Sequence, residues 1–194
     1  MNTVLWIYTY GAFGEILLPA ENNADLKVVL KKDVYELIDD VSLELEVEGK
    51  EWHLKESEKY RFVKKNGIKD DVLRNEDVIG IETENERFSI IVRKNEESFS
   101  VLQKYDISAM GTVSIGQEQN NHIIYQFLGL VSRHHAVIQK TAKGVFVRDI
   151  SGGDNEQGKG NGVFVNFKKI AGIYELKIGD CINIFGLKIV YFGE

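Results

Sequence analysis

A long internal repeat is the feature that most constrains the fold of this 194-residue chain. The segment Leu73–Ile81 is repeated, position by position, as Leu176–Ile184. A second strand-like run follows each copy, Phe88–Val92 after the first and Leu187–Tyr191 after the second. A period of about 100 residues is too long for a solenoid unit, so the repeat indicates two tandem domains.

Two shorter matches extend the repeat, Asn66-Gly67 with Asn161-Gly162 and Val41-Ser42 with Val131-Ser132. The polar residues of Lys94–Ser98 separate two strand-like runs, as a linker does. We therefore predict one domain over residues 1–95 and a second over residues 96–194.

Both halves consist of short runs of alternating or β-branched residues, and turn residues separate most of these runs. Only Asp33–Asp40 could form two helical turns, and it could equally be a strand and its loop. The sequence predicts an all-β fold of two tandem β-sandwiches, each of about ten or eleven strands. The expected strands are Thr3–Tyr8, Gly14–Leu18, Leu43–Val47, Glu51–Lys55, Val78–Glu82, Arg87–Val92, Phe99–Gln103, Thr112–Ile115, His122–Tyr125, Ala136–Gln139, Val145–Asp149, Gly162–Val165 and Cys181–Ile184.

A series of short motifs lies between the expected strands of the second half. In order they are Ser114-Ile115-Gly116, Ser132-Arg133-His134-His135, Asp149, Asn161-Gly162 and Val165-Asn166. This order resembles the forkhead-associated (FHA) domain, a β-sandwich whose loops bind phosphothreonine peptides. The resemblance implies ligand loops at residues 116–121, 126–135 and 150–161, where the expected strands leave long breaks.

The chain departs from the FHA pattern at two motif positions. Gln117 stands where the family has an arginine that contacts phosphate, and Gly160 replaces the Ser or Thr that precedes Asn-Gly. The first half departs further, because Val41–Leu45 contains neither a His nor a basic residue. The resemblance therefore implies a degenerate FHA-like sandwich followed by a better preserved one.

Five residues are candidates for contact with a partner or phosphopeptide: Gln117, Ser132, Arg133, Lys159 and Asn161. The Ser132 hydroxyl could bind a phosphate oxygen or only cap its turn. Arg133 is the best remaining cation, although a surface arginine is by default only solvated. Asn161 could bind a peptide backbone.

Four other motif residues are expected to be structural. The resemblance implies that His135 braces its loop from inside, at the entrance to an apolar strand. Gly116 closes an early strand, and Gly162 supplies the positive φ of its turn. Asn166 is expected to satisfy backbone groups of its own loop.

Charge limits the classes of partner. Residues 1–95 contain 14 Lys and Arg against 20 Asp and Glu, whereas residues 96–194 contain 10 of each. The first half therefore carries the net charge of −6. An acidic surface lacks the counterion release that drives nucleic-acid binding, so we expect protein partners instead.

Several other kinds of site are not supported. Cys181 is the only cysteine and lies in an alternating strand pattern, so we predict a small, buried core residue. The three histidines His122, His134 and His135 have no ligand-type spacing to a Cys or carboxylate, so we expect no metal. The P-loop-like run from Gly153 to Lys159 lacks the hydroxyl and the helix that a nucleotide site needs.

No catalytic arrangement of Ser-His-Asp or paired carboxylates can be argued from the sequence, so we expect neither enzyme activity nor a cofactor. The apolar runs are far shorter than a membrane-spanning helix, and the N-terminus lacks a secretory signal. We therefore expect an intracellular chain that does not insert into a membrane.

The order of two FHA-like halves, the second ending in Gly179–Tyr191, is similar to the N-terminal cytosolic region of the membrane ATPases of type VII secretion in Gram-positive bacteria. That resemblance implies a non-catalytic module that docks partners of the secretion machinery, held at the inner face of the cell membrane by the rest of an ATP-binding protein. Two alternatives stay open. One is a phosphothreonine reader using Ser132, Arg133, Lys159 and Asn161, and the other is an FHA regulatory region of an unrelated signalling enzyme.

Overall fold

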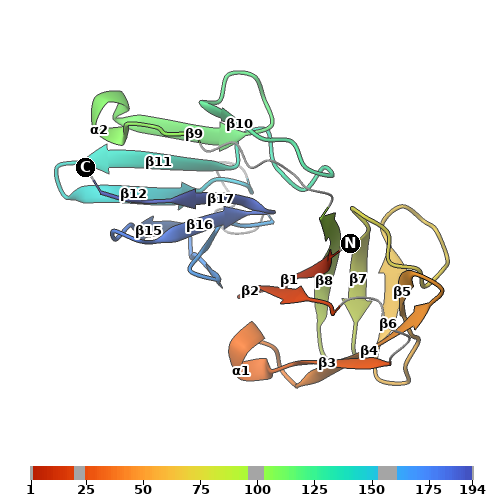
Figure 1. Ribbon diagram of the computed structural model, residues 1–194. Coiled ribbons are helices and arrows are strands. Elements are labelled where there is room, and N and C mark those ends of the chain that lie inside the picture. The colour runs from red at the N-terminus through yellow and green to blue at the C-terminus, as the bar shows by residue number, and fades with distance from the viewer. Residues whose placement is uncertain (1, 20–24, 96–102, 153–160, 194) are drawn as a thin grey trace. The chain divides into compact units, whose positions relative to one another are not determined.

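The computed structural model describes residues 2–19, 25–95, 103–152 and 161–193. It divides the chain into two compact units, Met1–Ser100 (unit 1) and Val101–Glu194 (unit 2), and nearly all of its regular structure is β-strand (Figure 1). The prediction of an all-β fold of FHA-like sandwiches is confirmed. The predicted boundary at residue 96, and with it most of the expected linker, lies outside the described residues.

Unit 1 contains a five-stranded sheet in the order β2-β1-β8-β7-β6 and a three-stranded sheet in the order β3-β4-β5. All the strand pairs are antiparallel. A single helical turn, α1 (Lys32–Tyr35), lies between β3 and β4 and overlaps Asp33–Asp40, the stretch for which the sequence left helix and strand open. The strands are β1 (Asn2–Tyr8), β2 (Phe13–Leu17), β3 (Leu26–Leu30), β4 (Val41–Glu48), β5 (Glu51–Leu54), β6 (Arg61–Lys64), β7 (Val78–Glu82) and β8 (Arg87–Asn95).

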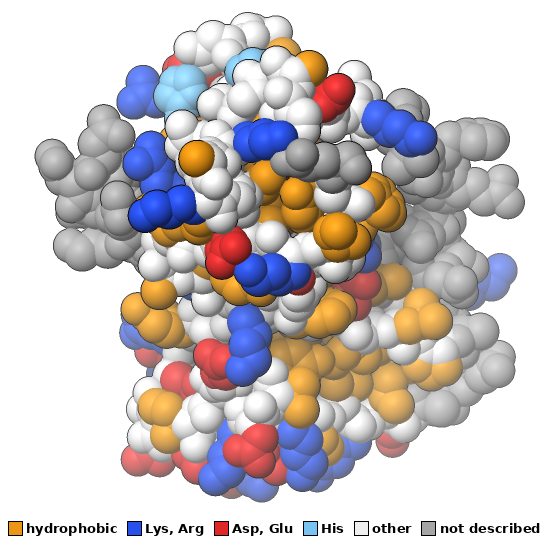
Figure 2. All heavy atoms as spheres, turned by 90° about the vertical axis from the view of Figure 1, so that its left-hand side faces the viewer, with side chains coloured by type: hydrophobic (Ala, Val, Ile, Leu, Met, Phe, Trp, Pro, Cys, Tyr) orange, Lys and Arg blue, Asp and Glu red, His pale blue; other side chains and the backbone are white. Residues whose placement is uncertain are grey.

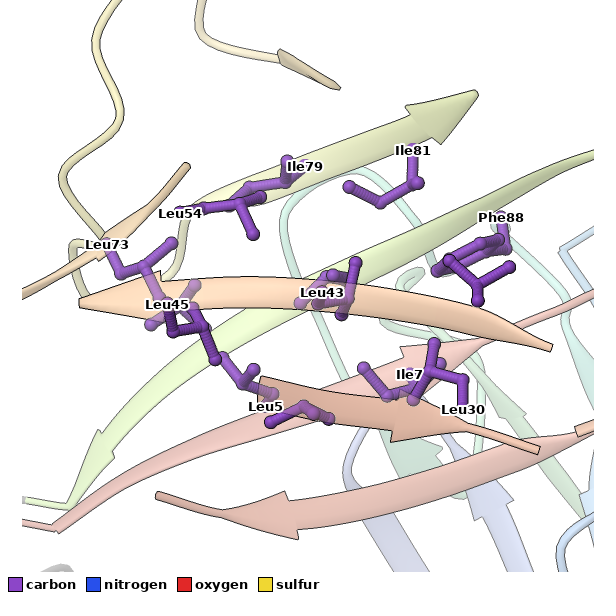
Figure 3. Packing of buried hydrophobic residues seen from close by; sticks show 14 of the residues in the cluster. Leu5, Ile7, Leu30, Leu43, Leu45, Leu54, Leu73, Ile79, Ile81 and Phe88 are labelled. Carbon is purple, nitrogen blue, oxygen red and sulfur yellow. The ribbon is translucent and has the colours of Figure 1, made fainter. Parts of the chain in front are cut away.

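The core of unit 1 lies between these two sheets (Figure 3). Alternation sets the inward face of each strand: Leu43 and Leu45 of β4 are buried, and Glu44 between them is exposed. Their side chains lie near Ile79 and Ile7, which come from the opposite sheet. Burying one such side chain contributes about 1.5–3 kcal/mol, so this face fixes the register of the strands.

Unit 2 has the sheets β10-β9-β11-β12-β15 and β14-β13-β16-β17. A short helix, α2 (Ile107–Met110), precedes β9, and the Asp106 side chain caps it by accepting hydrogen bonds from two backbone N–H groups. Among the described strands of unit 2, only the pair of β10 with β9 is parallel. The strands are β9 (Thr112–Gly116), β10 (Ile123–Ile124), β11 (Ala136–Thr141), β12 (Gly144–Asp149), β13 (Phe164–Val165), β14 (Lys168–Lys169), β15 (Ile173–Glu175), β16 (Cys181–Ile184) and β17 (Leu187–Val190).

The predicted strands match the structure best where they are central. The bounds of β7 and β16 agree with the prediction, and each forms a hairpin with the strand that follows it. The described residues contain eight strands in unit 1 and nine in unit 2, fewer than predicted. The expected strand Phe99–Gln103 lies almost entirely outside them. Sequence analysis missed β3, β6, β14 and β15, and also α2.

The two shorter matches of the repeat were wrong. Val41 begins β4 and pairs with Leu30, as Ala136 begins β11 and pairs with Ile115. Val41 therefore takes the place of Ala136 and not that of Val131, which lies in the preceding loop.

Asn66 was also matched to the wrong residue. Its side-chain amide donates to Asp77, and that of Asn166 donates to Asp180, the residue that matches Asp77 in the long repeat. Asn66 is thus the counterpart of Asn166. The side chain of Asn161 bonds elsewhere, to the carbonyl of Leu130.

The prediction that Cys181 is buried was also wrong. Cys181 is partly exposed, because it is the first residue of β16, whereas the next three residues of that strand are buried. Alternation predicted the strand correctly but not the exposure of its end.

The surface contains charged side chains of both signs. Figure 2 shows one face on which hydrophobic side chains lie between lysine, arginine and acidic side chains. The most exposed large hydrophobic residues are Tyr10 and Val63 in unit 1, and Ile178 and Phe192 in unit 2. Among the described residues, no helix is both long and apolar enough to cross a membrane.

Candidate functional site at the loop end of unit 2

The motif residues of unit 2 gather at one end of its sandwich, which we call the loop end. It is the end where β9 and β12 finish and where β11 and β13 begin. Its described segments are residues 117–122, 125–135, 150–152 and 161–163. Loops on a rigid sheet often carry binding function, so the contacts of these segments decide what the site can bind.

Gly116 allows the first two loops to lie close together. A Cβ atom on Gly116 would lie 2.1 Å from the carbonyl oxygen of Arg133, which leaves no room for any side chain. Asn121, only 6% exposed, joins the same loops by donating from its side-chain amide to the carbonyls of Arg133 (2.8 Å) and Glu118 (2.9 Å). The backbones of Glu118 and Arg133 are therefore held in fixed positions relative to each other.

His135 is fully buried and links the second loop to the third. Its Nδ1 accepts a hydrogen bond from the backbone N–H of Ser132 (3.0 Å), and its Nε2 donates to the carbonyl of Gly162 (3.0 Å). This pattern requires the neutral ring with its proton on Nε2. Burial lowers the pKa of His135, and the weaker opposing effects of the Gly162 hydrogen bond and the Asp149 charge do not reverse that direction.

Ser132 uses its hydroxyl within the protein. The hydroxyl donates to the backbone carbonyl of Ser151 over 2.9 Å. Ser151 in turn donates from its own hydroxyl to Asp149, which is fully buried. Because a hydroxyl has one proton, Ser132 has none to offer a phosphate oxygen in this arrangement.

Asn161 and Gly162 close the third loop onto the second. Asn161 donates from its side-chain amide to the carbonyl of Leu130 over 2.7 Å. Gly162 has φ +95°, a conformation that favours glycine, and its N–H donates to the Ser151 hydroxyl (3.3 Å). Both residues shape the loop end, and the Asn161 amide is already bonded within it.

Gln117 lies directly beside Ser132, at the position where the FHA pattern has its arginine. Its N–H donates to the Ser132 carbonyl (3.1 Å), and its carbonyl accepts from the Gln126 amide (3.2 Å). The side chain is partly exposed but uncharged. The position is thus filled by a group that cannot make a charge-assisted bond to phosphate.

Two basic side chains of the loop end, those of Arg133 and His134, lie next to an acidic side chain. Arg133 is largely exposed, and its Nε lies 3.9 Å from one carboxylate oxygen of Glu118. The other carboxylate oxygen lies 3.3 Å from Nε2 of His134. Glu118 was not among the predicted site residues, and neither were Asn121 and Ser151. The polar run around residues 117–121 has no motif that would single any of them out.

Asn166 does not belong to the loop end. It follows β13, has φ +49°, and joins the turn before β16. Its side-chain N–H donates to the Asp180 carboxylate (2.7 Å), and its side-chain oxygen accepts from the backbone N–H of Cys181 (3.0 Å). These bonds join Asn166 to the neighbouring turn and not to its own loop, for which it was expected to satisfy backbone groups.

The structure thus brings Gly116, Gln117, Ser132, His135 and Asn161 together with Arg133 and Gly162. Lys159 and Gly160, and the whole P-loop-like run from Gly153 to Lys159, lie outside the described residues. Where the structure describes the chain, no group of three or more His, Cys, Asp or Glu side chains could hold a metal ion. His122 instead accepts a hydrogen bond on Nδ1 from the N–H of Ser114 (3.1 Å).

Comparison with known families supports this picture of unit 2. Residues 113–185 match the family model described as "FHA domain", and this range contains all the described segments of the loop end. An FHA domain is therefore present in unit 2, and such domains are non-catalytic protein-interaction modules that bind phosphopeptides. The match does not extend into unit 1. No curated protein matches the chain.

Two solved structures are similar to parts of the chain. One is Mycobacterium tuberculosis EmbR in complex with a low-affinity phosphopeptide, with 28% identity and a TM-score of 0.34. That match covers 43% of this chain and only 21% of EmbR. The other is the NMR-based structure of the second FHA domain of a Mycobacterium tuberculosis ABC transporter, with 28% identity and a TM-score of 0.35. It covers 50% of this chain and 80% of that domain.

Proposed function

We propose that this chain is a non-catalytic interaction module that docks a protein partner on the loop end of unit 2 without dependence on phosphothreonine. The observation that carries the proposal is the state of the two residues at the expected phosphate position. Gln117 has no charge, and Ser132 donates its only hydroxyl proton to Ser151. The FHA fold is thus combined with a phosphate position at which neither residue 117 nor Ser132 offers the expected hydrogen bond to phosphate.

The size of the missing contact supports phosphate-independent docking. A hydrogen bond from an arginine to phosphate contributes on the order of 1.5–3 kcal/mol. Its loss would weaken a phosphopeptide by roughly 10 to 150-fold. Binding energy at this end then has to come from other groups, such as the exposed polar atoms of its loops.

The rival function is a phosphothreonine reader that uses Ser132, Arg133, Lys159 and Asn161. The exposure of Arg133 favours this alternative, because its side chain is 79% exposed and can turn towards a ligand. Such a reader would also need the Ser132 hydroxyl to leave the Ser151 carbonyl.

Titration of the full chain with a phosphothreonine peptide library and its unphosphorylated counterparts separates the two functions. Phosphate-independent docking predicts no preference for the phosphorylated members. Submicromolar, phosphate-dependent binding that is lost in Ser132→Ala would overturn the proposal and establish the reader. Ser108→Ala is a matched control, since Ser108 lies in α2, outside the loop end.

The proposal extends to the protein that contains this module. The tandem order of the halves and the incomplete phosphothreonine set support the N-terminal cytosolic region of EssC, the membrane ATPase of type VII secretion. In that setting the partners are proteins of the secretion machinery, and the module works at the inner face of the membrane. The alternative is a regulatory region of an unrelated signalling enzyme.

Two observations test this setting. Coding sequence for membrane helices and P-loop motor domains after residue 194 would support it, and a kinase or cyclase domain there would overturn it. In cells, Arg133→Glu should reduce secretion at unchanged protein abundance, whereas Lys177→Glu, a charge reversal outside the loop end, should not. Normal secretion in the Arg133 variant would show that this surface is not needed.

A further inference from the structure

We propose that Glu118 is a specificity-determining residue of the loop end, because its carboxylate lies beside Arg133, the cation that would otherwise attract a phosphate. The inference rests on the proposed function, in that it takes the loop end as the surface that meets the partner. The role of Glu118 is a second cause of phosphate independence, besides the absence of an arginine at position 117.

One carboxylate faces two basic side chains of the described loops, those of Arg133 and His134. Glu118 Oε1 lies 3.9 Å from Nε of Arg133, and Oε2 lies 3.3 Å from Nε2 of His134. All three side chains are 40% exposed or more, so a ligand could reach them. An anionic ligand at Arg133 would find a negative charge already in contact with that guanidinium.

The backbone of Glu118 is fixed by the fold, independently of its side-chain contacts. Its N–H donates to the Arg133 carbonyl (3.3 Å), and its carbonyl accepts from the buried amide of Asn121. The same amide donates to the Arg133 carbonyl, and the Asn121 oxygen lies 3.2 Å from Nδ1 of His134. One buried asparagine thus holds the backbone of Glu118 beside that of Arg133 and also bonds the His134 ring.

This arrangement has a clear electrostatic consequence. The charges of Glu118 and Arg133 cancel, so within the described loops this pair supplies no net positive potential to guide a phosphate to its site. A bound phosphate would also lie beside a carboxylate of like charge, and such contacts oppose binding. A partner segment without phosphate has neither cost, so Glu118 selects for an unphosphorylated partner.

The test compares two binding constants for the full chain, one for a phosphothreonine peptide and one for the same peptide without phosphate. Glu118→Gln keeps the size and hydrogen bonding of the side chain but removes its charge. We expect the preference for the phosphopeptide to rise about fivefold at low ionic strength, and less at high salt. Adding Gln117→Arg to Glu118→Gln should raise the preference for the phosphopeptide further. The new arginine supplies the missing phosphate contact, and no carboxylate at position 118 opposes it.

Two controls make the result specific. Glu175→Gln removes the same charge from an ion pair of unit 2, with Lys177 at 2.8 Å, and should leave the preference unchanged. Glu118→Asp retains a carboxylate and should keep the behaviour of the unaltered chain. Thermal unfolding of each variant confirms that the fold is intact.

The inference and the proposed function fail in different ways. If the unaltered chain already prefers the phosphopeptide, the proposed function is wrong, yet a further rise in Glu118→Gln would still support the role of Glu118. If a folded Glu118→Gln shows the same preference as the unaltered chain, the role of Glu118 is overturned. Inorganic phosphate, followed by chemical shifts of the loop residues, gives the same comparison without a peptide: tighter binding in Glu118→Gln supports the inference, and equal binding opposes it.

Discussion

His135 donates a hydrogen bond from Nε2 to the carbonyl oxygen of Gly162 over 3.0 Å, and so joins two loops that lie 27 residues apart in the chain. Its other ring nitrogen accepts from Ser132, which places the ring between the two loops. The loop end therefore depends on one neutral, buried histidine. Protonation would turn the Nδ1 acceptor into a donor facing another donor.

This relationship predicts a loss of stability in mild acid. Burial lowers the pKa of His135 in the folded protein below its ordinary value near 6.5. The unfolded chain then binds the proton more readily, so the free energy of unfolding should fall as the pH drops below about 6.5 and level off below the folded pKa. Urea unfolding of unit 2 at a series of pH values measures this change.

NMR titration of the His135 ring gives its pKa directly. A folded-state pKa at or above 6.5 would contradict the argument.

Gly116 supplies the second prediction. Gly116→Ala places a methyl group against the Arg133 carbonyl, so the two loops must separate. We expect a loss of about 1–3 kcal/mol in the unfolding free energy, together with weaker partner binding. Gly80→Ala is the matched control, because its nearest atom would lie 3.7 Å away in ordinary contact. Equal stability of the two variants in denaturant titration would show that the loops do not need this approach.

Lys64 supplies the third prediction, in unit 1. Its side chain is 1% exposed, and its Nζ lies 2.8 Å from both Asp70 and Asp77. Lys64→Ala leaves the buried Asp77 carboxylate without its cation, so we expect a loss of about 3–5 kcal/mol. Combining Lys64→Met with Asp77→Asn removes both charges and should recover part of that loss. Equal destabilisation in the single and double variants would show that the unpaired charge is not the cause.

The sequence predicted the central strands because their residues face one core. In Val78–Glu82 the alternation of buried and exposed residues is regular, and the prediction gave both ends correctly. The Ser-x-x-His motif likewise indicated a structural His135. In both cases the signal lies in residues that are near one another in the sequence.

Features that depend on distant contacts could not be predicted in this way. Lys64 looks like a surface residue in sequence, and its burial requires two carboxylates from a later loop. Glu118 and Asn121 lie in a polar run without periodicity, and their roles arise only when residue 133 folds beside them. Edge strands such as β15 have too few buried residues to give a pattern.

The last prediction uses the two matching aspartates of the repeat. Asp77 accepts hydrogen bonds from Asn66 and from the N–H of Arg74, and Asp180 accepts in the same way from Asn166 and the N–H of Lys177. Replacing either with alanine removes hydrogen bonds to a charged group, each contributing about 1.5–3 kcal/mol. Because each aspartate belongs to a separate compact unit, each variant should destabilise only its own unit.

The chain offers a separate probe for each unit. Both tryptophans, Trp6 and Trp52, lie in unit 1, and the only cysteine, Cys181, lies in unit 2. In urea titrations, Asp77→Ala should shift the tryptophan fluorescence transition to lower urea and leave thiol labelling of Cys181 unchanged. Asp180→Ala should leave the tryptophan fluorescence transition unchanged and shift the urea-dependent increase in Cys181 labelling to lower urea. This increase is measured over the slow background labelling of a partly exposed thiol in the folded unit. If either variant shifts both signals equally, the two units unfold together, and the independence of the tandem halves is refuted.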